Sequence, residues 1–165
     1  MLGKAIGAAL GAVLLTLAGC GEKPAEPIQP QAVEVAPVNP PGITVTDATV
    51  RLPVIAGRPG VAYLTVSQAN GAPRSITGIE VASAGRAEMH ETMEMDGMSS
   101  MKPIDRVPIE PGKSVEFAPG GRHVMLFDLD PKLRAGDETE LIVRFAEGDT
   151  ATAKATVTAL GGSPD

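Results

Sequence analysis

The sequence predicts an all-β domain, an antiparallel sandwich or barrel of seven or eight short strands. Three observations support this prediction. From Ile43 onward, short segments rich in β-formers are separated by turn residues, mainly Gly and Pro. No stretch of this region repeats apolar residues at the 3.6-residue period of a helix. Only four of the 165 residues are aromatic, so the core of such a domain must be aliphatic.

The first twenty residues have the pattern of an export signal. Lys4 supplies a positive charge, and the uncharged apolar run 5–18 is short for a membrane span and ends in small residues. Leu17-Ala18-Gly19-Cys20 resembles the bacterial lipobox, which implies removal of residues 1–19 and lipidation of Cys20. We therefore expect an envelope lipoprotein, held to the membrane by its lipid alone. The alternative is an ordinary secretory signal with an incidental cysteine.

Residues 20–42 are expected to form a lipid-anchored linker. Six prolines fall between Pro24 and Pro41, and there is little apolar surface to bury. Gly21 and Glu22 follow Cys20 directly, with no Asp beside the cysteine, which by resemblance to the sorting signals of two-membrane bacteria favours the outer membrane. We expect the chain to act in the periplasm or elsewhere in the cell envelope.

The predicted β domain covers residues 43–160 and is followed by a short tail, 161–165. Turn signals such as Gly57-Arg58-Pro59-Gly60 and Pro119-Gly120-Gly121 separate its segments. The candidate strands are Thr44–Leu52, Val61–Gln68, Ser75–Ala82, Ala87–Met93, Ser114–Phe117, His123–Leu129, Glu138–Phe145 and Thr152–Thr158.

Charge and cysteine content exclude several functions. The net charge of −6 and the scarcity of aromatic residues argue against nucleic-acid binding. The single cysteine rules out an internal disulfide and any Cys-based zinc ribbon or iron–sulfur cluster. The sequence contains no catalytic-triad elbow, P-loop or dinucleotide fingerprint, so we do not expect an enzyme.

Methionine and histidine gather in one region. Six of the seven methionines and both histidines lie within residues 89–125. Alternation along a strand places His123 and Met125 on one face, with Val124 and Leu126 on the opposite, core-facing side. His90 lies in another strand, where it would share an outer face with Glu88 and Thr92. Met101 follows a loop that could fold it back towards them.

These residue types select a metal. Thioether is a soft, neutral ligand that suits Cu(I) and binds Zn²⁺, Mg²⁺ or Ca²⁺ poorly. Outside the cytoplasm methionine also has an advantage over cysteine, since it cannot be lost to disulfide formation. Two imidazoles and two thioethers at one end of the sheet would therefore form a Cu(I) site.

The spacing of the four residues matches a family. His90, ten residues, Met101, twenty-one residues and then His123-Val124-Met125 resemble the signature of the PCuAC copper chaperones, the former DUF461 group. The resemblance covers roughly residues 44–158 and implies a cupredoxin-like Greek-key β-sandwich. It implies metal ligation by His90, Met101, His123 and Met125. It also implies delivery of Cu(I) to a cuproenzyme, typically the CuA centre of cytochrome c oxidase, or to another chaperone.

One feature departs from the family pattern. Some PCuAC proteins carry a His/Met-rich C-terminal tail, whereas this chain ends in Gly161-Gly162-Ser163-Pro164-Asp165. A second copper site of that kind is not expected. Met93, Met95 and Met98 lie in the first loop instead, as an auxiliary metal site or as an apolar docking surface. The acidic residues around them, Glu88, Glu91, Glu94 and Asp96, are interpreted as solvated surface charge.

Two other functions compete with the carrier. A blue-copper electron carrier needs a Cys thiolate ligand, and Cys20 belongs to the signal, far from the domain in sequence. An envelope lipoprotein whose Met-rich loop docks a protein without metal is the other alternative. We expect a monomer in either case.

Overall fold

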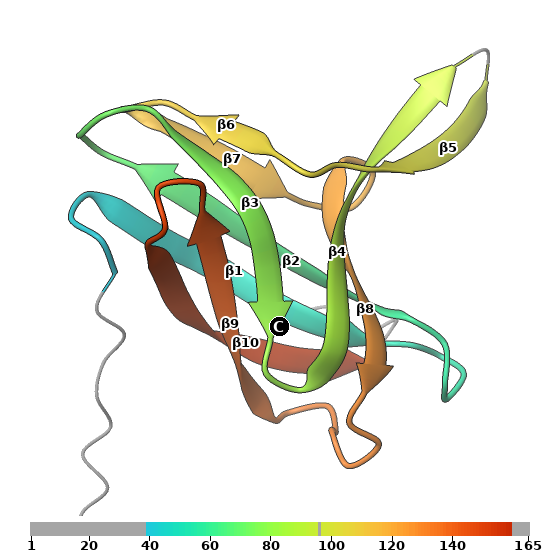
Figure 1. Ribbon diagram of the computed structural model, residues 1–165. Coiled ribbons are helices and arrows are strands. Elements are labelled where there is room, and N and C mark those ends of the chain that lie inside the picture. Colours follow the sequence, from blue (N-terminus) through green and yellow to red (C-terminus); the bar gives the residue numbers. More distant parts are fainter. Residues whose placement is uncertain (1–38, 96, 160–165) are drawn as a thin grey trace, which may run out of the picture. The chain divides into compact units, whose positions relative to one another are not determined.

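The computed structural model describes residues 39–95 and 97–159, and the regular elements in these ranges are all strands. The predicted all-β class is confirmed (Figure 1). No helix capable of crossing a membrane occurs within these two ranges. The signal, Cys20, most of the linker and the tail lie outside the described residues. The strands are β1 (Ile43–Leu52), β2 (Gly60–Gln68), β3 (Arg74–Val81), β4 (Ala84–Met95), β5 (Met98–Pro103), β6 (Val107–Ile109), β7 (Lys113–Phe117), β8 (Arg122–Leu129), β9 (Glu138–Phe145) and β10 (Thr150–Ala159).

The strands form one mixed sheet in the order β5-β4-β8-β2-β1-β10-β9-β3-β6, with β7 also paired to β2. All pairs are antiparallel except β1 with β10, which is parallel. The prediction of a wholly antiparallel sheet was wrong on this point. A parallel pair needs a long connection, and β1 and β10 are joined by the whole domain. The first and last strands can therefore lie side by side.

The core is aliphatic, as the composition requires. Along β2 the inward positions are Gly60, Ala62, Leu64, Val66 and Gln68, all buried, while the intervening residues are half-buried. The same alternation along β9 buries Leu141, Val143 and Phe145. Each such aliphatic side chain contributes about 1.5–3 kcal/mol when it leaves water. Of these two strands, β2 pairs with β8, which carries the first half of the candidate site.

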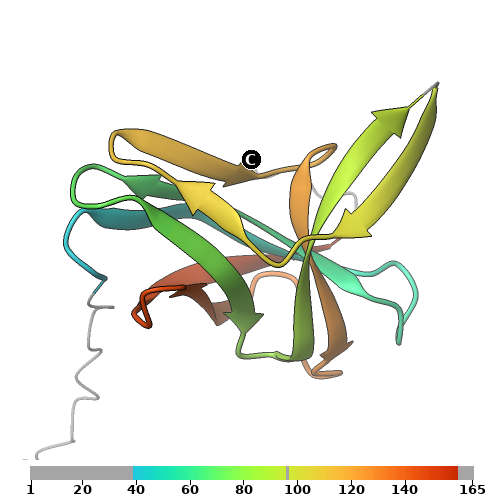
Figure 2. The ribbon, with the colours of Figure 1, turned by 45° about the horizontal axis from the view of Figure 1, so that its top comes forward.

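The β4–β5 hairpin projects beyond the rest of the domain (Figures 1 and 2). Its second strand is absent from the candidate strands, because Met98–Pro103 contains two serines, a lysine and a proline and shows no apolar alternation. All six of its residues are exposed. A fully exposed strand shows no apolar alternation, so only its pairing with β4 defines it. β6 was also missed, since it is a three-residue edge strand with Pro108 at its centre.

Candidate metal site

Strand β8 presents its two candidate ligands on the face opposite the core. Val124 and Leu126 are both 0% exposed, and they fix the inward face of the strand. His123 and Met125 consequently project from the other face, as the alternation predicted. Met125 is half-buried there, whereas His123 is only 7% exposed. Burying Val124 and Leu126 therefore also orients the imidazole and the thioether.

The two histidines lie directly opposite each other. His90 on β4 is the cross-strand partner of His123 on β8. Their ring centroids are 5.9 Å apart and the ring planes are tilted by 32°. The pairing of two buried core-facing neighbours, Met89 and Val124, keeps this register, because a slip of either strand by one residue would turn the imidazole of that strand inward.

Strand register also places the two methionines on the histidine face. Met125 is opposite Glu88, which lies two residues before His90. Met101 on β5 is opposite Thr92, which lies two residues after His90. Residues two apart in a strand share a face, so both thioethers belong to the face that carries the imidazoles. Met101 is 60% exposed, so much of this residue is accessible to solvent and to other molecules.

A backbone carbonyl orients His123. Its Nδ1 lies 3.0 Å from the carbonyl oxygen of Gly121, so Nδ1 carries the proton and donates it. The same oxygen accepts a hydrogen bond from the backbone N–H of Thr92 at 3.2 Å, which ties it to β4. The lone pair of His123 is therefore on Nε2. A metal-binding histidine commonly donates its other ring N–H in this way.

A carboxylate orients His90 in the opposite sense. Its Nε2 lies 3.2 Å from Oε2 of Glu88, and an ionised carboxylate can only accept, so Nε2 carries the proton. The lone pair is then on Nδ1, which is buried and has no hydrogen-bond partner. A buried polar atom without a partner is costly, and a bound cation would satisfy it. Each of the two imidazoles thus has one nitrogen whose lone pair is available to a metal.

The remaining methionines of the hairpin do not share this face. Met93 is opposite Ser100, so strand alternation puts it on the side away from His90. Met98 is paired with Met95 and is 73% exposed. The side chain of Met95 lies outside the described part of the protein. The structure therefore brings Met101, but not Met93 or Met98, to the histidine face.

The ligand set is soft. Among residues 39–95 and 97–159, no three His, Cys, Asp or Glu side chains lie close enough to hold a metal ion. Two neutral imidazoles and two neutral thioethers suit Cu(I). Because these ligands carry no charge, the site with bound Cu(I) would keep the single positive charge of the ion.

The acidic residues nearest the histidines already have partners. Glu91 lies 3.4 Å from Arg122 on the neighbouring strand. Glu88 is bonded both to His90 and to Arg86. The interpretation of Glu88 as solvated surface charge was incomplete, since this carboxylate contacts His90. The signal was available in the two-residue spacing of Glu88 and His90 along a strand, which places them on one face.

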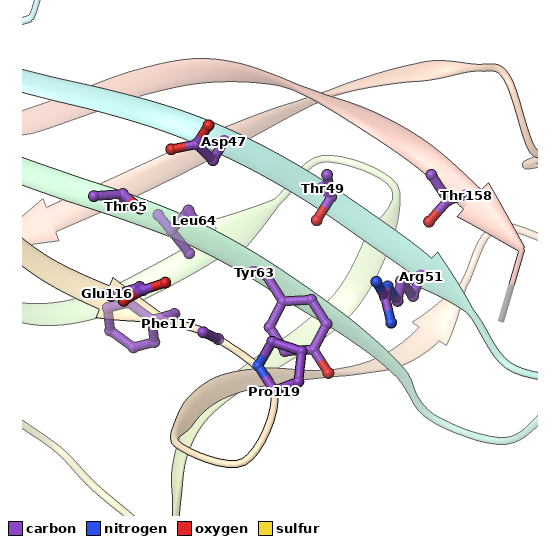
Figure 3. A pocket seen from close by; sticks show the side chains of 11 residues that line it. Asp47, Thr49, Arg51, Tyr63, Leu64, Thr65, Glu116, Phe117, Pro119 and Thr158 are labelled. Carbon is purple, nitrogen blue, oxygen red and sulfur yellow. The ribbon is translucent and has the colours of Figure 1, made fainter. Parts of the chain in front are cut away.

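A separate pocket of about 230 Å³ lies over β1, β2 and β7 (Figure 3). Its lining is mixed: it includes the polar residues Asp47, Thr49, Thr65 and Glu116 and the apolar residues Leu64, Phe117, Ala118 and Pro119. Arg51 lies 5.3 Å from the ring centre of Tyr63. No histidine or methionine lines it. It therefore contributes nothing to the soft-metal site predicted from the sequence.

Comparison with known proteins identifies relatives of this chain. The family model described as "Putative lipoprotein LpqE-like" matches residues 43–157. The "Putative lipoprotein Lxx21020" of Leifsonia xyli subsp. xyli is 27% identical over 146 residues, which cover 86% of this chain and 81% of the relative. The uncharacterized protein RP573 of Rickettsia prowazekii is 31% identical over 84 residues, covering 50% of this chain and 46% of the relative.

Solved structures share the fold. The copper-bound PCuAC domain from PmoF2 has a TM-score of 0.60 at 22% identity, covering 76% of this chain and 99% of that domain. The solution structure of CuI-DR1885 from Deinococcus radiodurans has a TM-score of 0.58 at 25% identity, covering 73% and 80% of the two chains. The resemblance to PCuAC proteins drawn from the His/Met spacing is confirmed by these matches.

Proposed function

This chain belongs to the LpqE-like lipoprotein family, and we propose that it is a copper carrier of the bacterial envelope and not an enzyme. The observation that carries the proposal is the pair of imidazoles on adjacent strands, each with one nitrogen held in a hydrogen bond and the other left to bind. The copper named in the titles of the PmoF2 and DR1885 structures supports the choice of metal.

The proposed ligands of Cu(I) are His90, His123, Met101 and Met125. The register of β4 with β8 and β5 supports this set, since it gives all four side chains one face. Met93, Met95 and Met98 are not needed to complete four-fold coordination. We assign them at most an auxiliary role at the end of the hairpin.

The unequal exposure of the proposed ligands supports a role in delivering the metal. His123 is nearly buried, whereas Met101 is mostly exposed on the projecting hairpin. A neutral thioether is replaced more easily than an anionic ligand, and replacement one ligand at a time avoids releasing a free ion. In the proposed transfer, a ligand of the recipient displaces Met101 first. The recipient is a cuproenzyme such as the CuA centre of cytochrome c oxidase, or another chaperone.

Anchoring would keep this exchange at a membrane surface. We propose that the chain is cleaved before Cys20, lipidated there and held by the linker 20–42. Two or more acyl chains make such anchoring stable, whereas one would be marginal. The lipoprotein family supports this placement in the envelope.

An anaerobic Cu(I) titration against a colorimetric chelator tests the binding. The wild-type chain is expected to take up one tight equivalent, and the Met101→Leu/Met125→Leu variant to bind much more weakly, since leucine keeps the volume but offers no ligand. Met93→Leu/Met98→Leu is the matched control, because it removes two thioethers of the same hairpin from outside the histidine face. Equal affinities for all three proteins would refute the proposed ligand set.

A metal-independent docking module is the second candidate. The exposure of Met98 and Met101 on a projecting hairpin favours it, because flexible thioether side chains adapt to a partner surface. The same titration distinguishes the copper carrier from the docking module. Absence of tight Cu(I) binding by the wild-type chain, together with capture of a defined envelope protein that depends on Met98 and Met101, would support docking alone.

A further inference from the structure

The histidine face contains a chain of contacts that reaches beyond the proposed ligands. Reading along β4, Arg86, Glu88 and His90 are each two residues apart and so lie on one face. Opposite them on β8 are Phe127, Met125 and His123 in the same order. The Arg86 guanidinium lies 3.9 Å from the centre of the Phe127 ring, a cation–π contact at close range.

Glu88 divides its two oxygens between its neighbours. Oε1 accepts a hydrogen bond from Arg86, and Oε2 lies 3.2 Å from Nε2 of His90. Arg86 is itself restrained by the stacked Phe127 ring, so one carboxylate oxygen is occupied and the other is directed at the imidazole. The side chain of Glu88 is 38% exposed, and these contacts limit the orientations that it would otherwise sample.

The hydrogen bond to Glu88 determines which ring nitrogen of His90 carries the lone pair. A carboxylate accepts and does not donate, so the tautomer with the proton on Nε2 is the one it stabilises. That tautomer leaves the lone pair on the buried, unpartnered Nδ1. For His123 the Gly121 carbonyl selects the reverse arrangement, with the lone pair on Nε2.

We propose that Glu88, held by Arg86, is a positioning residue that makes Nδ1 of His90 the copper-binding atom, paired with Nε2 of His123. The inference rests on the proposed function. Glu88 does not bind the metal: it acts through the ring, by fixing its tautomer and orientation. Arg86 stabilises the carboxylate that does so.

Nitrogen-15 NMR of the imidazoles tests the tautomer in copper-free protein, using the full chain with Cys20→Ser so that it stays unlipidated. The wild-type side chains should show His90 protonated at Nε2 and His123 protonated at Nδ1. Glu88→Ala should redistribute the His90 proton between both nitrogens, and His123 serves as the internal control. Glu88→Gln should retain the wild-type tautomer, since its amide oxygen can still accept.

Cu(I) competition on the same proteins measures the consequence. Loss of an outer partner of a metal-binding histidine typically weakens binding by about 10–100-fold, and Glu88→Ala should fall in that range. Glu88→Gln should stay within about threefold of wild type, because the acceptor remains although the charge is lost. Glu91→Ala is the matched control: Glu91 is also ion-paired with an arginine and adjoins His90, but lies on the other face.

The outcomes distinguish this inference from the proposed function. If wild-type protein binds Cu(I) tightly and Glu88→Ala matches it in both affinity and tautomer, the inference alone is wrong. It is also wrong if the Cu(I)-loaded protein shows Nε2 of His90 bound. If the wild-type chain does not bind Cu(I), the proposed function fails and the inference fails with it. A comparable loss in Glu91→Ala would indicate a general electrostatic effect and overturn the specific role of Glu88.

Discussion

Thr92 lies directly opposite Met101, and this pairing puts a thioether from the projecting hairpin onto the face that carries the histidines. Thr92 is two residues beyond His90 on β4, so Met101 and His90 share that face although eleven positions separate them in sequence. The proposed copper site therefore depends on the register of β5, a strand with no buried residue of its own.

Exchanging two neighbouring residues of β5 tests this dependence on register. The double variant Ser100→Met/Met101→Ser keeps the composition but moves the thioether to the position opposite Met93, on the other face. We expect it to bind Cu(I) as weakly as Met101→Ser alone. The loss should be at least about tenfold, equivalent to about 1.4 kcal/mol.

Competition against a chelator measures that affinity, and circular dichroism checks that the variants remain folded. Met101→Leu controls for loss of the thioether without a change of position. Wild-type affinity in the exchanged variant would mean that the hairpin does not define the face of the site.

Substitutions at core and site positions of β8 should differ in their effect on the free energy of unfolding. Leu126→Ala removes a fully buried side chain and is expected to lower the free energy of unfolding by about 2–5 kcal/mol. Met125→Ala, next to it in sequence, removes a half-buried side chain on the other face and should cost clearly less. Urea unfolding of the copper-free protein gives both values.

The same two substitutions should affect the affinity for Cu(I) in the reverse order. Met125→Ala removes a proposed ligand and is expected to weaken Cu(I) binding, whereas folded Leu126→Ala should retain most of it. Equal destabilisation by the two substitutions would contradict the assignment of faces along β8.

Lipid attachment should depend on one residue. Replacing Cys20 by Ser removes the thiol that the lipobox resemblance identifies for acylation, so the chain should lose labelled fatty acid and move from the membrane fraction to the soluble fraction. Cell fractionation with radiolabelled palmitate measures both. Continued labelling of Cys20→Ser would show that the anchor lies elsewhere.

The visible spectrum should exclude a blue-copper centre. No cysteine occurs in the domain, so the Cu(II)-treated chain with Cys20→Ser should lack an intense blue absorption band. Optical titration with Cu(II) tests this directly. An intense band in that variant would reveal a strongly covalent ligand that neither the sequence nor the strand pairing accounts for.

Much of the β8 geometry could be predicted from sequence, because burial of Val124 and Leu126 leaves a clear two-residue alternation. The shared face of Glu88, His90 and Thr92 followed from the same rule. The strand state of Met98–Pro103 could not be predicted, since an exposed edge strand has no apolar pattern and its register is set by pairing with β4. The parallel pairing of β1 with β10 is likewise a long-range property that local patterns do not encode.

The orientation of the imidazole rings could not be predicted from the sequence either. Spacing can place Glu88 beside His90, but it cannot show that one carboxylate oxygen is taken by Arg86 while the other reaches the ring. Nor can it show that the Gly121 carbonyl accepts from His123. Such contacts depend on side-chain rotamers, which neighbouring strands determine together.

X-ray absorption spectroscopy of the Cu(I)-loaded chain counts the atoms bound to the metal and so examines the proposed ligand set itself. We expect two imidazole nitrogens and two thioether sulfurs, with both sulfurs lost in Met101→Leu/Met125→Leu and both retained in Met93→Leu/Met98→Leu. A wild-type spectrum without sulfur, or a sulfur count unchanged by replacing Met101 and Met125, would contradict this ligand set.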